Sequence, residues 1–281
     1  MAAHHEFRDS GELGAYGLRI EGLALAERLL VRADSSWPEL QIVAKRGSIE
    51  GFDEHVDSDR ATFVLLGAVA VAERSPGRAV FTFDGEPNPE ALVHPYLAPI
   101  AGLFAHWHGR ESVHAGAFVA GGGAWAVVGE REGGKSSMLA RLALDGVPIV
   151  TDDMLVLENG VAFAGPRAID LRREPAQALG VGDPLGVLGA RERWRLRLDE
   201  TASTWPLRGW VFLAWADDVS VTPVSAGDRL QRLAAERTIR LVPPDPRALL
   251  RLSALPAFEL RRPRDWSSLE EATTLLLASL P

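Results

Sequence analysis

The chain has 281 residues, enough for one large domain or two modest ones, and 47% of them are hydrophobic, so a sizeable core can form. Its 30 basic and 38 acidic residues give a net charge of −8, which argues against the broad basic face of a nucleic-acid-binding protein. The lack of cysteine excludes disulfides, thiolate zinc sites and cysteine nucleophiles.

The N-terminal residues carry no apolar segment of the kind that forms a signal peptide. The longest apolar run, residues 63–72, is about half of what a membrane-spanning helix needs. A soluble cytoplasmic protein without a membrane partner is therefore expected. His4 and His5 are expected to lie in a flexible N-terminus and not in a metal site.

Residues 1–111 predict a smaller mixed α/β domain, in which no motif carries chemistry. The hydrophobic pattern and turn residues predict strands over 18–23 and 79–85, a turn over 34–38 and a helix-like segment over 94–108. The three histidines of the last segment, His94, His106 and His108, are expected to be ordinary surface or core residues.

Residues 112–281 predict a second, larger α/β domain. The expected strands cover 113–120, 124–128, 147–150, 154–158, 161–164, 210–215 and 219–222. Helices are expected over 135–144, ending at Gly146, over 225–237, and near the C-terminus. Asn159-Gly160 predicts a hairpin turn, while Ser225 with Asp228 and Ser267 with Glu270 resemble helix-capping pairs.

A glycine-rich loop follows the strand at 124–128. Gly129-x4-Gly134-Lys135-Ser136 fits the G-x4-G-K-[ST] pattern, between an apolar strand and an amphipathic helix. Glycines let successive N–H groups point at phosphate oxygens, and the helix adds its own N–H groups and dipole. Lys135 would reach the β- and γ-phosphates and Ser136 would ligate Mg²⁺, so ATP and Mg²⁺ are the expected cofactors. The predicted binding residues are Gly129, Glu130, Arg131, Glu132, Gly133, Gly134, Lys135, Ser136 and Ser137.

The interior of this loop is charged. Glu130 and Glu132 stand where small residues are usual, and two carboxylates would repel a triphosphate. They are compatible with a phosphate site if they point outward or pair with Arg131.

Two adjacent acids, Asp152 and Asp153, follow the buried strand at 147–150. The end of that strand is expected to lie at the carboxyl edge of a sheet, beside the loop. One acid would hold the metal through water, and the other would accept the proton of an attacking hydroxyl. Each acid also raises the proton affinity of the other, which suits a base.

Further charged residues surround this region. His114 is expected on the strand that precedes the loop strand. Asp170 is a candidate second metal ligand, and Arg167 or Arg172 a candidate phosphate clamp, against the alternative of an ordinary charged strand edge. The alternating arginines, which would share one strand face and are expected mostly in solvent, are Arg191, Arg193, Arg195 and Arg197.

The order of His114, the loop at 129–136 and the Asp152-Asp153 pair resembles the HPr kinase/phosphorylase superfamily. The resemblance covers about residues 112–172. It implies an α/β fold, with a P-loop kinase-like C-terminal domain at 112–281 and a smaller N-terminal domain at 1–111. Within the loop, Arg131-Glu132 stands where the family usually has Ser-Gly, and no segment matches the one linked to dephosphorylation.

The resemblance also implies roles for individual residues. Lys135 would stabilise phosphate charge, and Ser136 with Asp170 would hold Mg²⁺. Asp153 would be the proton acceptor, supported by His114, and Asp152 would assist electrostatically. These are the predicted catalytic and metal residues.

The function that the resemblance implies is an ATP-dependent kinase that phosphorylates a serine hydroxyl of a peptide or small protein. The string at 165–172 resembles divergent HPr-kinase-like proteins of modified-peptide biosynthesis, and it implies a precursor peptide as acceptor. Two alternatives stay open: a regulatory nucleotide-binding module without transfer, and a plain ATPase. The N-terminal domain is the candidate for acceptor recognition, and assembly into a homo-oligomer is suggested but not required.

Overall fold

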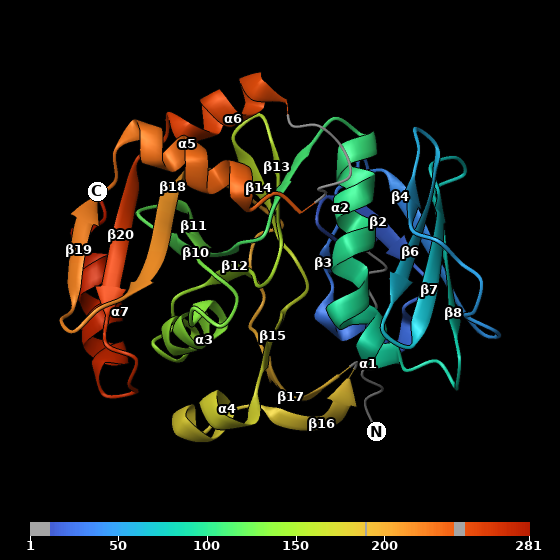
Figure 1. Cartoon of the computed structure of the whole chain (residues 1–281), viewed down its shortest axis with the longest axis horizontal. Helices are drawn as coiled ribbons and strands as arrows, with labels where there is room; N and C mark the ends of the chain where they lie inside the picture. The colour runs from blue at the N-terminus through green and yellow to red at the C-terminus, as the bar shows by residue number, and fades with distance from the viewer. Residues whose placement is uncertain (1–11, 189, 239–244) are drawn as a thin grey trace, which may run out of the picture.

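The computed structural model describes residues 12–188, 190–238 and 245–281. It is a mixed α/β protein with three sheets and few long helices (Figure 1). His4 and His5 lie outside the described residues. Within the described part, none of the helices combines the length and the apolar character that crossing a bilayer requires.

The N-terminal sheet comes entirely from the first 83 residues. Its eight strands have the order β3-β1-β2-β4-β8-β7-β6-β5. Their bounds are β1 (Leu13–Ala15), β2 (Leu18–Glu21), β3 (Val31–Arg32), β4 (Glu39–Arg46), β5 (His55–Val56), β6 (Arg60–Leu65), β7 (Ala68–Glu73) and β8 (Arg78–Phe83). The expected strands at 18–23 and 79–85 correspond to β2 and β8.

The second sheet carries the loop and the acid pair. Its strand order is β12-β10-β11-β18-β14-β13-β9, and β20 pairs with β18 and β19. The bounds are β9 (Glu111–Val113), β10 (Gly116–Ala120), β11 (Gly123–Val128), β12 (Ile149–Thr151), β13 (Leu155–Glu158), β14 (Val161–Phe163), β18 (Thr204–Trp215), β19 (Ser220–Pro223) and β20 (Ala257–Arg262). A separate sheet of order β15-β17-β16 uses β15 (Ala168–Leu171), β16 (Asp183–Leu188) and β17 (Arg191–Arg197).

The described residues form nine helices. They are η1 (Ala24–Leu29), α1 (Pro89–Ala91), η2 (Leu92–Tyr96), α2 (Leu97–Trp107), α3 (Lys135–Leu144), α4 (Arg173–Leu179), α5 (Ala226–Ala235), α6 (Pro246–Ser253) and α7 (Ser268–Ser279). Helices α3 and α7 lie on one face and α5 and α6 on the other, while α2 lies between this sheet and the N-terminal one (Figure 1).

Strand β18 shows why both faces are covered. Its successive side chains point to opposite faces, as they must in a pleated strand. Trp210 and Phe212 join the core that includes Leu233 of α5, whereas Val211 joins the core that includes α3 and α7. The first of these cores also contains residues of the N-terminal sheet and α2, so a continuous apolar core links the two sheets.

Strand direction decides where the site can form. Strands β11, β18 and β20 are parallel neighbours. Strand β12 is antiparallel to β10, which is antiparallel to β11, so β12 also runs in the direction of β11. The carboxyl ends of all four strands therefore lie at one edge, where ligands of α/β sheets usually bind.

Several local predictions are confirmed. Helix α3 has the expected bounds, and Gly146 (φ 79°) follows it in a Schellman arrangement in which Val147 N donates to Leu142 O. Asn159 and Gly160 both have positive φ and join β13 to β14. Ser225 caps α5 by accepting a hydrogen bond from Asp228 N.

Other local predictions are wrong. The expected strand at 113–120 is two strands, because β9 pairs with β13 whereas β10 pairs with β11 and β12. His114 lies in the break between them and not on a strand. Helix α7 is not capped by Ser267 with Glu270, because Asp265 accepts the hydrogen bond of Ser268 N instead.

Candidate functional site

The glycine-rich loop joins the carboxyl end of β11 to α3. It turns tightly, with Gly133 N donating to Glu130 O at 2.9 Å. Gly134 has φ 87°, and a Cβ there would lie 2.7 Å from a guanidinium nitrogen of Arg262 and 3.1 Å from the ring of Trp215. Gly134 also has no side chain to cap α3, so the first N–H groups of the helix remain available to an anion.

Lys135 lies inside the loop. Its Nζ donates to Gly129 O at 2.6 Å and to Glu130 O at 3.3 Å, and the residue is 8% exposed. Burial lowers the pKa of Lys135. The negative charges of Glu236, Asp153 and Asp152 raise it, but burial has the larger effect. The ammonium group is therefore placed where the loop curls around it, and the charges of three acids act on it.

Glu132 turns away from the centre of the loop. It has φ 68°, and its carboxylate accepts a hydrogen bond from Arg172 at 2.7 Å, with Arg191 at 4.0 Å. The hydrogen bond from Arg172 lowers the pKa of Glu132. Of the two arrangements expected to be compatible with a phosphate site, Glu132 adopts the outward one, because it pairs with Arg172.

Asp152 follows β12 and faces the start of α3. Ser136 Oγ donates to Asp152 Oδ1 at 3.2 Å. Asp152 is buried, and burial first, then the charge of Asp153, raises its pKa to about 7. The expected meeting of the acid pair and the loop at one sheet edge is confirmed, because β11 and β12 end on the same side.

This raised pKa predicts a pH-dependent stability. The folded protein keeps a proton on Asp152 up to about pH 7, whereas the unfolded chain releases it near the usual 3.8, so the folded state binds more protons in this window. The free energy of unfolding contributed by Asp152 therefore falls as the pH rises from about 4 to about 7. Thermal melts of Asp152→Asn should show a flatter pH profile and a higher Tm than wild type at pH 8.

The exposed Asp218 supplies the control for this measurement. Asp218→Asn should leave the wild-type profile of Tm against pH unchanged. Parallel profiles for wild type and Asp152→Asn would contradict a protonated Asp152 in the folded state.

Asp153 points toward solvent and His114. It has φ 96°, a backbone conformation that costs energy for a residue with a side chain and is concentrated at functional sites. His114 Nδ1 lies 3.6 Å from Asp153 Oδ1, just beyond a hydrogen bond. Their side chains are 39% and 38% exposed, so a molecule from solvent can reach both.

Two residues near the acids had no sequence motif to reveal them. Tyr16, in the turn between β1 and β2, is buried, and burial with the charge of Asp153 raises its pKa above the usual range. Its N donates to Ala164 O at 2.7 Å. Tyr16 also lines the same cavity as Asp152, so a turn of the N-terminal sheet reaches the acid pair. Glu236, after α5, accepts a 2.6 Å hydrogen bond at its backbone O from His114 N. For Tyr16, the one signal in the sequence was the Tyr16-Gly17 turn between alternating residues. For Glu236, the sequence held no signal.

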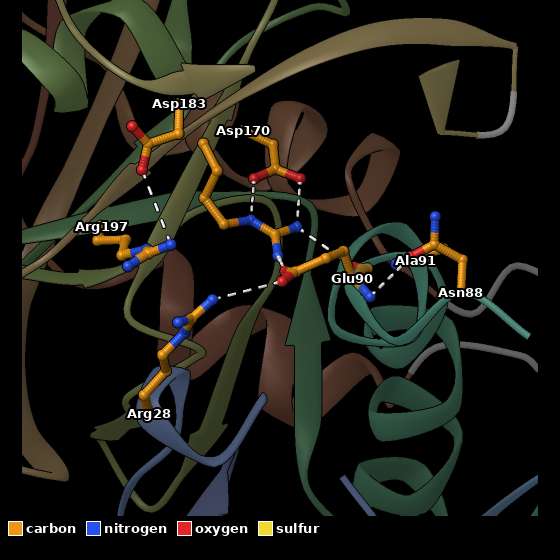
Figure 2. A network of polar contacts seen from close by, with 8 residues as sticks. Arg28, Asn88, Glu90, Ala91, Asp170, Asp183 and Arg197 are labelled. Carbon is orange, nitrogen blue, oxygen red and sulfur yellow. Dashed lines mark hydrogen bonds and ion pairs between the residues drawn. The ribbon is translucent and has the colours of Figure 1, made fainter. Parts of the chain in front are cut away.

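Asp170 is held by an arginine. Arg195 donates to its two oxygens at 2.6 and 2.7 Å, and both side chains are almost fully buried. Arg195 also pairs with Glu90 of α1, which lies 3.6 Å from Arg28 (Figure 2). The expectation that the alternating arginines lie mostly in solvent is wrong for Arg195, because the ion pair with Asp170 buries it.

The candidate phosphate clamps lie in different places. Arg172 reaches the loop through Glu132. Arg167 instead donates to the backbone oxygens of Arg28 and Leu30, which ties β15 to the N-terminal region. The structure thus brings Arg172, but not Arg167, to the loop.

The donor set fits Mg²⁺ in part. A hydroxyl and a carboxylate, Ser136 and Asp152, lie side by side, and Mg²⁺ is commonly held by one or two carboxylates together with substrate phosphates. Asp152 and Asp170 line the same cavity of about 10 Å³, but both oxygens of Asp170 are engaged by Arg195. The described residues contain no group of three or more acids and histidines able to hold a metal alone. The metal role of Asp170 stays a prediction.

Comparisons with known proteins give little beyond this geometry. No family model and no curated protein matches the chain. Among solved structures, the HPr(Ser) kinase/phosphatase from Coxiella burnetii is similar over 59% of this chain and 93% of its own, with 12% identity and a TM-score of 0.30. A likeness this weak assigns neither the fold nor the activity.

Proposed function

We propose that the chain is a Mg²⁺-dependent kinase that transfers the γ-phosphoryl group of ATP to a serine hydroxyl of a peptide or small protein. The observation that carries this proposal is the hydrogen bond between Ser136 and Asp152 beside the buried Lys135. Phosphoryl-transfer enzymes commonly combine a glycine-rich loop, a lysine, a hydroxyl and a carboxylate, and here these groups lie at one sheet edge.

Each residue has a role in this proposal. The N–H groups of the loop and of the first turn of α3 bind the phosphates, and Lys135 stabilises the charge that develops on them. Ser136 and Asp152 would hold Mg²⁺, which neutralises phosphate oxygens when bound. Glu132 does not oppose this, because Arg172 holds it away.

Asp153 is the proposed general base. Its carboxylate is accessible to solvent and therefore to an acceptor hydroxyl, unlike the buried Asp152. His114, whose Nδ1 lies 3.6 Å from Asp153 Oδ1, would support Asp153 in this role. Tyr16 brings the N-terminal sheet close to this pair, which favours acceptor recognition by that region. A precursor peptide is the proposed acceptor class.

The proposal is tested by incubating the protein with labelled ATP, Mg²⁺ and a library of serine-containing peptides. Label on a serine is the expected result, with slow hydrolysis when no peptide is present, because water lacks the positioning of a bound acceptor. Binding of nucleotide without labelled peptide would point to a regulatory module. Fast phosphate release without peptide would point to an ATPase.

Lys135→Ala should weaken Mg-ATP binding about 10- to 100-fold, the loss expected for one charge-assisted hydrogen bond to phosphate. Isothermal titration calorimetry measures this directly. Arg141→Ala, on the same helix and paired with Asp145 away from the loop, is the matched control and should bind like wild type. Equal affinities for Lys135→Ala and wild type would remove the lysine from the phosphate site.

A further inference from the structure

An aromatic and two arginines lie at the carboxyl ends of β18 and β20. Trp215, the last residue of β18, is 39% exposed although it is a large apolar side chain. Arg262, the last residue of β20, lies 4.5 Å from the centre of its ring, and Arg264 lies 5.7 Å from it. This cluster of Trp215, Arg262 and Arg264 is named the Trp215 platform below.

The Trp215 platform adjoins the glycine-rich loop. A Cβ on Gly134 would lie 3.1 Å from the Trp215 ring and 2.7 Å from Arg262, so both side chains contact the loop directly. Arg262 is 4% exposed, and its Nη1 donates to Pro263 O at 3.1 Å and Asp265 O at 3.3 Å. Arg262 is therefore held in place and supports the ring, whereas Arg264 is exposed.

Strand order gives the direction of a bound nucleotide. The order is β12-β10-β11-β18, with β20 beside β18, and the loop follows β11 in the middle. The acids lie after β12, on one side of the loop, and the Trp215 platform lies on the other. A nucleotide whose terminal phosphate faces Asp153 has its phosphates over the loop and its base beyond it, at the ends of β18 and β20.

We propose that Trp215 is the stacking platform for the purine base of the nucleotide. This inference rests on the proposed function, because it takes the loop as the phosphate site. Indole and purine rings stack through their faces, and one face of the indole is already supported by a buried guanidinium. The base displaces the exposed Arg264 from the ring, and stacking replaces the contact of Trp215 with water.

The test compares two ligands, Mg-ATP and Mg-triphosphate without a base, by calorimetry on the full chain. Wild type should bind Mg-ATP more tightly than Mg-triphosphate. Trp215→Ala should weaken Mg-ATP binding about tenfold, equivalent to ~1.4 kcal/mol, and leave Mg-triphosphate binding unchanged. Trp215→Phe, which keeps an aromatic face, should recover most of the affinity for Mg-ATP.

Trp266 supplies the matched control, because it is 38% exposed and lies on the loop before α7. Trp266→Ala should bind both ligands like wild type. A Trp215→Ala protein that binds Mg-ATP like wild type, or that loses affinity for both ligands equally, overturns the platform while the phosphate site stands. Wild type that binds neither ligand overturns the proposed function and the platform together.

Discussion

Replacing Asp153 by asparagine is expected to lower the rate of phosphoryl transfer by about 10²-fold to 10⁴-fold, the usual contribution of a general base. Asparagine has the same shape and tolerates the positive φ of residue 153, but it does not accept a proton at neutral pH. Mg-ATP affinity should stay within about twofold of wild type, because the phosphates are held by the loop. Single-turnover kinetics with labelled ATP and an acceptor peptide measures the rate, and calorimetry measures the affinity.

The control for this prediction is Asp145→Asn. Asp145 lies at the other end of α3, paired with Arg141, and its substitution should leave the rate unchanged. A wild-type rate of phosphoryl transfer by Asp153→Asn would show that Asp153 is not the general base. Loss of Mg-ATP binding together with transfer would instead place Asp153 among the groups that hold the nucleotide.

Replacing Arg195 by alanine is expected to lower the free energy of unfolding by about 3–5 kcal/mol, which is the cost of leaving a buried charge without its partner. Asp170 would lose both hydrogen bonds from Arg195 in a site where its side chain is 1% exposed. Glu90 would keep Arg28 but lose Arg195, so the contact between α1 and the β15–β17 sheet would weaken (Figure 2). Urea unfolding at pH 7 measures the change.

Arg197→Ala is the matched control on the same strand. Arg197 is 50% exposed and lies 3.7 Å from Asp183, so its loss should change the free energy of unfolding by less than about 1 kcal/mol. The double variant Asp170→Leu with Arg195→Met should recover much of the lost stability, because it removes the buried charges on both sides of the ion pair. Equal destabilisation by Arg195→Ala and Arg197→Ala would show that burial does not strengthen the Arg195 pair.

The Arg195 network also links the two halves of the chain to the site. Asp170 lines the same small cavity as Asp152, and Glu90 belongs to the segment that precedes α2. Arg195 thus connects the cavity lined by Asp152 to the segment that precedes α2. The predictions for Asp153 and Arg195 can be tested separately, because Asp153→Asn is expected to lower the rate of phosphoryl transfer and Arg195→Ala the free energy of unfolding.

The sequence alone determined the parts of the site whose geometry is local. The spacing from Gly129 to Ser136 and the cap at Gly146 predicted the loop and the bounds of α3, because a tight turn and a helix depend on residues a few positions apart. Asn159-Gly160 predicted its hairpin for the same reason. The position of Asp152 beside Ser136 followed from one further assumption, that both strands end at the same edge.

Only the tertiary structure decided the contacts between distant segments. His114 lies in a break because β9 and β10 pair with different strands, and no pattern within 113–120 records those partners. Arg195 is buried because Asp170 and Glu90, 25 and 105 positions away, meet it. Trp215 reaches the loop through the strand order of the second sheet. Tyr16 reaches the acids because a turn of the N-terminal sheet packs against the second sheet at Ala164. Hydrophobic periodicity specifies which face of an element is buried, but strand pairing and buried ion pairs depend on which elements meet across the fold.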